Sequence, residues 1–224
     1  MAQFFLSEAA KWYKQEPHQK AAWDALESKL DSDTLEAFKT AYRAAQRPQK
    51  SNPLSVPYFQ QLDNASGEGY RECFSSSCAM LAAFYGKVKT DDEYNTIRRR
   101  FGDTTNLGAQ VEALKSLGLK PEFRTNGRLA DLLDSIDDGH PVAVGWLHKG
   151  HVSNPSGGGH WSVVIGYDNK TQQLIHHDPF GEAALVGGDY VNHTRGKAIR
   201  YSYKNWVPRW EVDGPRTGWL LTCR

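Results

Sequence analysis

The sequence has almost no excess of charge of either sign. It contains 27 lysines and arginines against 26 aspartates and glutamates in 224 residues. Strong binding to nucleic acid or to an anionic membrane requires an excess of positive charge. The near balance therefore gives no reason to expect nucleic acid or a membrane as the main partner. The basic triplet at residues 98–100 is typical of a solvated helix face, since three adjacent arginines do not make a nucleic-acid site.

Long apolar runs are also missing. No stretch of about 18 apolar residues occurs, so the sequence predicts no membrane-spanning helix. The start, Met-Ala-Gln-Phe-Phe-Leu-Ser-Glu, lacks the basic region and the long apolar centre of a secretory signal. We therefore expect cytoplasmic synthesis without a Sec signal, and any action at the cell wall would follow release.

Cysteine is scarce. The three cysteines are Cys73, Cys78 and Cys223, an odd number that does not suggest a disulfide framework. Cys73 and Cys78 lie five positions apart in a predicted helix, where their side chains do not face each other. Cys78 stands among alanine and methionine and has the character of a small buried apolar residue. No role can be assigned to Cys223 from its position at the chain end.

The apolar residues among the first 47 positions are spaced as they are in helices. Ser7 is suited to cap a first helix at residues 8–15, and Pro17 to the first turn of a second. Residues 47–55 contain two prolines and no apolar period, which is typical of a linker. The sequence thus predicts a helical module at residues 1–50 and a second domain at residues 51–224. Apolar side chains recur at helical spacing in the second and third helices at Trp23, Leu26 and Leu30, and at Leu35, Phe38 and Tyr42.

The second domain begins with helices and continues with strands. Gly86 is placed to end a helix that opens at Cys73, and a capping box at Thr90 begins the next helix, which ends near Gly102. Helices followed by strands, without βαβ alternation, predict an α+β domain with an antiparallel sheet. Further helices are predicted at 107–117 and 128–138, and strands at 119–124, 141–147, 160–167, 174–177 and 197–203, with a last edge strand at 218–222.

Cys73 stands where a glycine-rich loop at residues 66–69 enters the first of these helices. The free amide groups and the dipole at a helix N-terminus stabilise a thiolate, which is the nucleophilic form of cysteine. Cysteine-based acyl transfer also needs a general base, a group that orients the base, and a donor for the oxyanion. The sequence offers a candidate for each role.

His160 follows three glycines and opens a predicted strand, which is a natural position for a general base at the end of a sheet. Asp178 follows the next strand, so a hairpin between the two strands would bring it beside His160 to hold the imidazole in one tautomer. Gln60 and Gln61 precede the cysteine. A glutamine side chain near the helix start, together with the backbone amide of Cys73, would complete an oxyanion hole.

Five motifs follow one another between residues 54 and 181. They are Val-Pro-Tyr-Phe-Gln-Gln from Val56, Cys-Phe-Ser-Ser-Ser-Cys-Ala-Met-Leu from Cys73, Gly-His-Pro-Val-Ala-Val-Gly-Trp from Gly139, Gly-His-Trp-Ser-Val-Val-Ile-Gly-Tyr-Asp from Gly159, and His-Asp-Pro-Phe-Gly from His177. Their order resembles that of the peptidase C39-like group of papain-fold cysteine peptidases, relatives of the bacteriocin-processing double-glycine peptidases.

The resemblance implies a papain-like fold and a cysteine peptidase without cofactor or metal. It implies that Cys73 is the nucleophile, His160 the base and Asp178 its orienting group. It also implies Gln61 as the oxyanion donor, since the family's glutamine follows its Pro-Tyr pair by two further residues, while Gln60 stays open. One departure stands out, because the family's usual Cys-Gly-Pro-Thr is Cys-Phe-Ser-Ser here.

Two substrate classes remain open: peptidoglycan peptides, as for a phage lysin, and protein. Residues 16–26 resemble a Pro-His-Gln-x-x-Ala-x-x-x-Leu helical segment associated with phage and cyanobacterial cell-wall proteins, which favours the wall. No transporter segment is evident, which weakens a role in leader removal coupled to export.

Two other functions are alternatives to peptidase activity. The first is a peptide- or wall-binding module of the same fold without turnover, which would be expected to lack the nucleophile. The second is a zinc hydrolase that would draw its ligands from four histidines, with Cys73 or Asp178 added: His148, His151, His176 and His177. Adjacent histidines on a strand point to opposite faces, and no HExxH or CxxC motif is present, so no metal is expected.

Overall fold

The computed structural model of the chain describes residues 24–25, 27–35, 37–38 and 52–224. The chain divides into two compact units, residues 1–49 and 50–224. In the first unit, described residues form helical turns on either side of Asp31, whose carboxylate accepts hydrogen bonds from the backbone and hydroxyl of Thr34 at 2.9 and 2.7 Å. The predicted helix at 8–15 and much of the next two lie outside the described residues. The assignment of residues 1–50 as a separate module and 51–224 as the peptidase domain stays a prediction.

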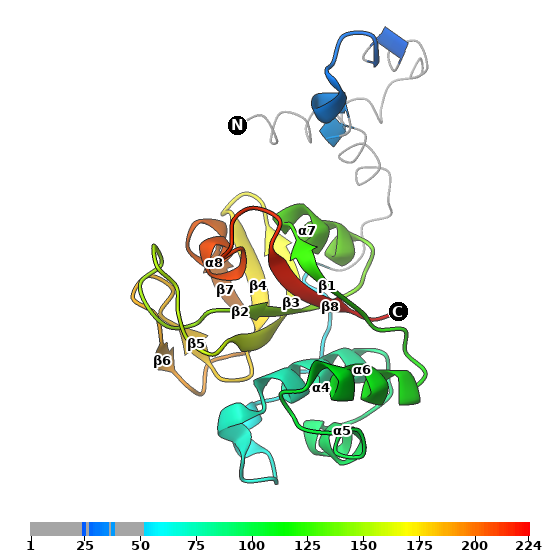
Figure 1. Ribbon diagram of the computed structural model, residues 1–224, viewed down its shortest axis with the longest axis vertical. Helices are drawn as coiled ribbons and strands as arrows, with labels where there is room; N and C mark the ends of the chain where they lie inside the picture. The colour runs from blue at the N-terminus through cyan, green and yellow to red at the C-terminus, as the bar shows by residue number, and fades with distance from the viewer. Residues whose placement is uncertain (1–23, 26, 36, 39–51) are drawn as a thin grey trace. The chain divides into compact units, whose positions relative to one another are not determined.

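The second unit is built around a six-stranded antiparallel sheet (Figure 1). The strands follow the order β1-β8-β2-β3-β4-β7, and β5 and β6 form a separate two-stranded sheet. The helices are η1 (Gln61–Asp63), η2 (Gly69–Arg71), α4 (Cys73–Phe84), α5 (Asp91–Arg98), α6 (Leu107–Ser116), α7 (Leu129–Asp137) and α8 (Tyr203–Trp210). The strands are β1 (Glu122–Gly127), β2 (Val142–Trp146), β3 (His160–Asp168), β4 (Gln173–His177), β5 (Glu182–Ala183), β6 (Tyr190–Asn192), β7 (Ile199–Ser202) and β8 (Gly218–Thr222).

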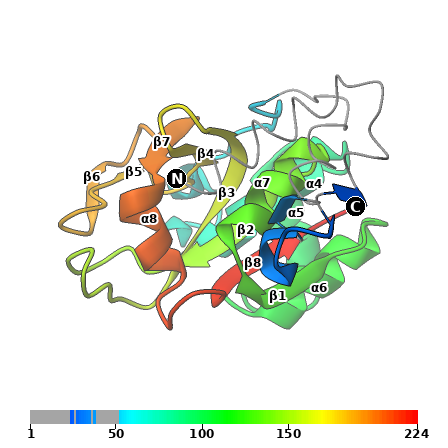
Figure 2. The same ribbon diagram turned by 90° about the horizontal axis from the view of Figure 1, so that it is seen from above.

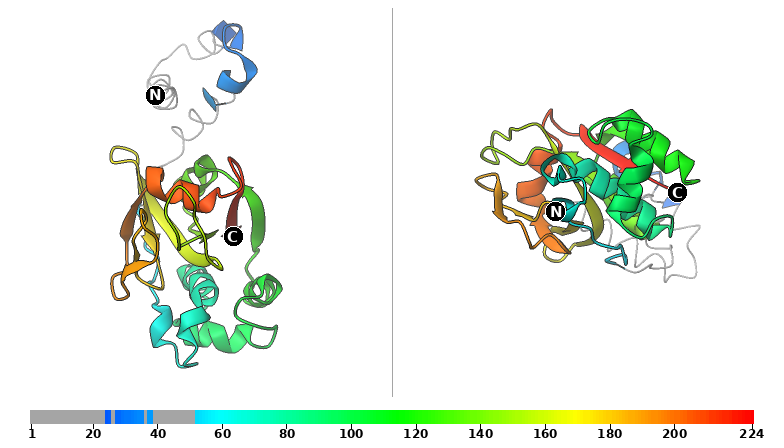
Figure 3. Two further views of the ribbon diagram at one scale, coloured as in Figure 1. Left: turned by 60° about the vertical axis from the view of Figure 1, so that its left-hand side comes forward. Right: turned by 90° about the horizontal axis from the view of Figure 1, so that it is seen from below.

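Helices cover both faces of the large sheet. Figure 1 shows α4, α5 and α6 on one face and α7 and α8 on the other, and Figure 2 shows the second face from above. In the view from below in Figure 3, α4 and α6 lie in front of the strands. Every residue of α4 from Phe74 to Ala82 is buried, and most of them are serine or alanine. Small side chains allow close packing of this helix against its neighbours, so the first turn of α4 has a well-defined position at the end of the sheet.

The predicted α+β class is confirmed, with helices packed on an antiparallel sheet. The prediction of β8 as an edge strand is wrong, because β8 lies between β1 and β2. Leu220 and Leu221 point to opposite faces of the sheet and are both buried, because helices cover both faces. The predicted strand at 119–124 is shifted, since β1 runs from Glu122 to Gly127.

Helix α8 was not predicted. The strand expected at 197–203 ends at Ser202, whose side chain accepts a hydrogen bond from the amide of Asn205 at 3.3 Å and caps the helix. Trp206 and Trp210, four residues apart, are both buried and stack on each other. The serine cap and this spacing are the local signals for the helix. The β5–β6 hairpin was also missed.

Candidate active site

Cys73 is the first residue of α4 and is partly exposed. Its sulfur lies close enough to the imidazole of His160 to help raise the pKa of that ring. The loop before α4 is tightly folded, because a side chain at Gly69 would collide with the backbone oxygen of Gln61, which lies 2.1 Å from the position of an added Cβ. This glycine allows the loop to turn back on itself just before the helix that carries the thiol.

His160 begins β3, where it is paired with Trp146 of β2 and buried. Its Nε2 lies 2.8 Å from Oδ1 of Asp178. Burial opposes a charge on this imidazole, but the carboxylate of Asp178 and the Cys73 sulfur outweigh burial and raise the pKa of His160 to about 10. At neutral pH the imidazolium form is therefore favoured, as a thiolate–imidazolium pair requires.

Asp178 is fully buried directly after β4. Besides His160, its carboxylate accepts hydrogen bonds from the amide of Phe180 at 3.0 Å, from the Tyr190 hydroxyl at 3.1 Å and from the Tyr201 hydroxyl at 3.2 Å. Burial, followed by the negative charge of Asp178, raises the pKa of both tyrosines well above its usual value. Both hydroxyls thus remain donors. No sequence pattern joins these tyrosines to Asp178, because they lie on the separate strands β6 and β7.

Gln61 is buried, and its Nε2 donates a hydrogen bond to the backbone oxygen of Gly69 at 2.6 Å. The backbone amide of Gln61 donates a hydrogen bond to the backbone oxygen of Pro179 at 2.9 Å, which connects η1 to the segment after Asp178. Gln60 instead donates its side-chain amide to the backbone oxygen of His193. Gln61 therefore belongs to the loop that leads into Cys73, and its role as oxyanion donor stays a prediction.

Phe74 occupies the position at which the sequence departs from the family pattern. Its ring stacks on Trp161 with the centroids 3.9 Å apart and the planes 9° from parallel. An added side chain at Gly145 would lie 3.0 Å from the Trp161 ring, so this glycine leaves room for the indole. The residue after the cysteine thus packs on the residue after the histidine, and the departure adds a contact between the two segments.

The four histidines considered as metal ligands have other contacts. His177 bonds through Nε2 to the oxygen of Val56 at 2.9 Å, and His151 to Ser153 at 2.8 Å. His176 is fully buried, and its Nδ1 lies 3.0 Å from the Ser162 hydroxyl.

The fourth, His148, packs edge-on against His160 with the ring centroids 5.7 Å apart. Burial, and then the charge of His160, lowers the pKa of His148 to about 4. Among the described residues, no three or more histidine, cysteine, aspartate or glutamate side chains are grouped as a metal site.

A cysteine at a helix N-terminus, in contact with a buried histidine–aspartate pair at the end of an antiparallel sheet, is the arrangement of a papain-like cysteine hydrolase. The model of the Peptidase_C39 like family matches residues 53–206. The chain belongs to this family, and it is a cysteine peptidase. No curated protein matches the sequence. In the part of the chain that the structure describes, every helix is too short or too polar to cross a bilayer.

Three solved structures are similar. A protein described as a C39-like peptidase from Bacillus anthracis has 17% sequence identity and a TM-score of 0.53, over 78% of this chain and 98% of that chain. The peptidase domain of Streptococcus ComA, a bifunctional ABC transporter of a quorum-sensing pathway, has 22% identity and a TM-score of 0.50, over 75% and 97%. A double-glycine-motif protease from an AMS/PCAT transporter, solved with a leader peptide, has 17% identity and a TM-score of 0.44, over 79% and 96%.

Proposed function

We propose that the protein hydrolyses peptide amide bonds through an acyl-enzyme on Cys73. The observation that carries this proposal is the buried His160–Asp178 contact at 2.8 Å, with the Cys73 sulfur near enough to the same imidazole to influence its pKa. This arrangement supplies a nucleophile, a proton carrier and an orienting carboxylate in one place.

In the proposed reaction, the Cys73 thiolate attacks the amide carbonyl and the carbonyl oxygen becomes an oxyanion. The backbone amide of Cys73 and the side chain of Gln61 stabilise that charge. His160 then gives its proton to the leaving amine as the carbon–nitrogen bond breaks. His160 then takes a proton from a water molecule that attacks the thioester. The carbon–sulfur bond breaks, the carboxylic acid leaves, and the Cys73 thiolate and the His160 imidazolium are restored.

The proposed substrates are peptides, either in peptidoglycan or in protein. The wall is supported by the resemblance of residues 16–26 to cell-wall proteins, most of which lies outside the described residues. A binding module without turnover is the alternative, and the Cys73–His160 contact argues against it.

The test is to incubate the protein with purified peptidoglycan and, separately, with a mixed peptide library, and to identify products by mass spectrometry. We expect new amino and carboxyl ends in at least one arm, and no products from Cys73→Ala. Circular dichroism should show that this variant remains folded, since it removes one sulfur atom from a partly exposed site.

A chelator arm separates thiol from zinc chemistry. Activity retained by Cys73→Ala but lost with the chelator would favour a metal hydrolase. Binding of peptide by the wild-type protein, with no product in either arm, would favour the binding module.

A further inference from the structure

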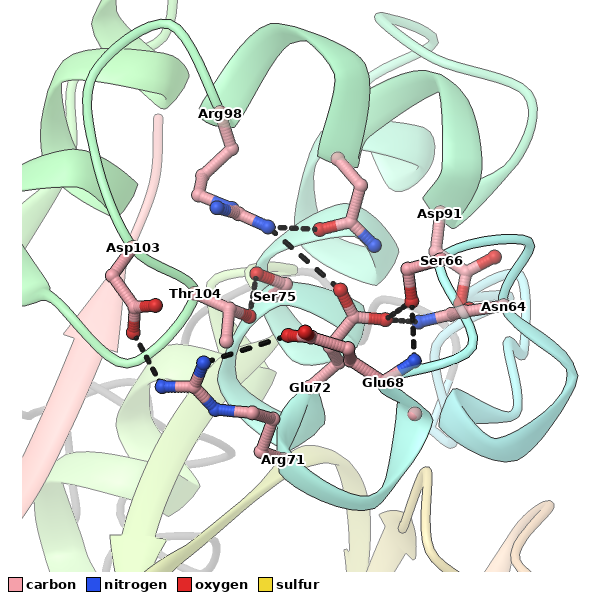
Figure 4. Close-up of polar contacts among 12 residues, drawn as sticks. Asn64, Ser66, Glu68, Arg71, Glu72, Ser75, Asp91, Arg98, Asp103 and Thr104 are labelled. Atoms are coloured by element: carbon pink, nitrogen blue, oxygen red, sulfur yellow. Dashed lines mark hydrogen bonds and ion pairs between the residues drawn. The ribbon is translucent and has the colours of Figure 1, made fainter.

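Glu72, the residue before Cys73, is a buried carboxylate. It is 2% exposed, and Figure 4 shows it between the loop residues Asn64 and Ser66 on one side and Arg98 on the other. A carboxylate is costly to bury unless hydrogen bonds and an opposite charge compensate for lost water. Its position at the start of the nucleophile's helix therefore calls for an explanation.

Two loop side chains bind this carboxylate. The amide of Asn64 donates to Oε2 of Glu72 at 2.7 Å, and the hydroxyl of Ser66 donates to the same oxygen at 2.7 Å. Asn64 and Ser66 both belong to the segment between Gln61 and Gly69. One carboxylate oxygen thus fastens the middle of this segment to the first residue ahead of α4.

The two ends of the same segment are fastened to each other. Gly69 accepts a hydrogen bond from the Gln61 side chain at 2.6 Å and another from the Glu72 backbone amide at 3.2 Å. One hydrogen of the Gln61 amide group is used in this contact, which fixes the orientation of the second. The position of Gln61 relative to the Cys73 amide therefore depends on how firmly this segment is held.

Arg98 of α5 compensates for the charge of Glu72. Its side chain is 5% exposed, and its Nη2 lies 3.8 Å from Oε1 of Glu72. The same guanidinium donates to the oxygen of Gly102 at 2.7 Å and to Asn95 at 3.0 Å. Without this cation, the Glu72 charge would oppose a thiolate on the adjacent residue. The pair therefore keeps the hydrogen-bonding carboxylate while reducing its repulsion of the nucleophile.

We infer that Glu72 is a positioning residue for the oxyanion hole. It holds the segment that carries Gln61 against the start of α4, so that the Gln61 amide and the Cys73 backbone amide keep the spacing that oxyanion binding needs. This inference rests on the proposed function, and it assigns to Glu72 no contact with substrate.

The test compares Glu72→Gln with Glu68→Gln. Both remove a charge from the same stretch of chain, but Glu68 is exposed and pairs only with Arg71 in the contacts described, at 3.5 Å. For a peptide that the wild-type protein cleaves, kcat of Glu72→Gln should fall about 10- to 100-fold, below the full loss of an oxyanion donor, with KM within about threefold. Alkylation of Cys73 by iodoacetamide forms no oxyanion, so its rate should stay within about twofold.

Each other result overturns the inference. An unchanged kcat would show that Glu72 is not needed for positioning. If the rate of Cys73 alkylation fell as much as kcat, Glu72 would act on the reactivity of the thiol and not on the oxyanion hole. If the kcat of Glu72→Gln equals that of the wild type at temperatures well below the unfolding midpoint of the variant, Glu72 contributes only to structural stability.

If Glu72→Gln does not fold, Ser66→Ala provides the test. It removes one hydrogen bond to Glu72 and leaves the buried ion pair in place, and it should show the same pattern with a smaller loss of kcat. The absence of cleavage by the wild-type protein in both substrate arms would overturn the proposed function itself, and this inference with it.

Discussion

Cys73 is partly exposed, whereas Cys78 and Cys223 are buried. Burial raises the pKa of the Cys78 thiol well above its usual value and that of Cys223 to about 12. Both remain protonated near neutral pH, and solvent does not reach them. Cys73 instead contacts an imidazole whose pKa is raised to about 10. At the scale of single residues, surroundings rather than residue type make Cys73 the candidate nucleophile among the three cysteines.

We expect iodoacetamide to label Cys73 at least about tenfold faster than the other two cysteines near neutral pH, because only this thiol is accessible and paired with an imidazolium. Peptide mapping by mass spectrometry after timed quenching measures the three rates. Asp178→Asn should slow labelling of Cys73, since it removes the charge that supports the His160 imidazolium. Labelling of Cys78 at an equal rate would refute the assignment of Cys73 as the activated thiol.

At the scale of elements, α8 connects two loops beside the site through Arg209. Its buried guanidinium donates hydrogen bonds to the backbone oxygens of Leu185, Leu147, Lys149 and Gly150 at 2.7 to 3.1 Å. The loop that contains Leu147, Lys149 and Gly150 also carries His148. The backbone oxygen of His148 accepts a hydrogen bond from the backbone amide of Asp189, which lies in the loop of Leu185, next to Tyr190. One side chain therefore holds in place the two loops that approach His160 and Asp178.

Arg209→Lys should lower the free energy of unfolding by about 2 to 4 kcal/mol, because an ammonium group does not reach four carbonyl groups at once and leaves some of them buried and unpaired. Urea denaturation followed by tryptophan fluorescence measures the change. Arg200→Lys is the matched control, since its ion pair with Asp168 is half exposed and its replacement should cost less than about 1 kcal/mol. Equal effects of the two variants would contradict this role for Arg209.

At the scale of the whole molecule, buried histidines make stability depend on pH in two directions. Burial, and then the charges of His177 and His160, lowers the pKa of His176 from 6.5 to about 3. Between these values the unfolded chain binds a proton that the folded protein does not, so the contribution of His176 falls as the pH falls. The pKa of His160 is raised to about 10, so its contribution is complete below 6.5 and is lost as the pH rises toward 10.

We expect His176→Phe to flatten the acid side of the stability profile. Between about pH 4 and 6, the slope of unfolding free energy against pH should decrease by up to about 1.4 kcal/mol per pH unit, the value for one proton. Urea titrations at several pH values measure the slope independently of any constant loss of stability. His151→Gln changes an exposed histidine and should leave the slope unaltered. Parallel profiles for wild type and His176→Phe would refute the prediction.

Much of the fold and part of the site could be predicted because the signals are local. Glycines, caps and apolar periods predicted α4, α6, α7 and most strands within a few residues. The candidate residues Cys73, His160 and Asp178 stood at element boundaries, and strand pairing brought the last two together. The cell-wall substrate and the catalytic roles of Cys73, His160, Asp178 and Gln61 remain predictions.

The sequence by itself determined most of the segments that become helices and strands, and at which of their ends a cysteine, a histidine and an aspartate stand. Only the tertiary structure decided that β8 enters the interior of the sheet, that Tyr190 and Tyr201 bind Asp178, and that Glu72 is buried against Arg98. The physical reason is the separation along the chain of the residues that interact. Local propensity depends on neighbours along the chain, whereas a buried polar group takes whichever partner the packed segments bring near it.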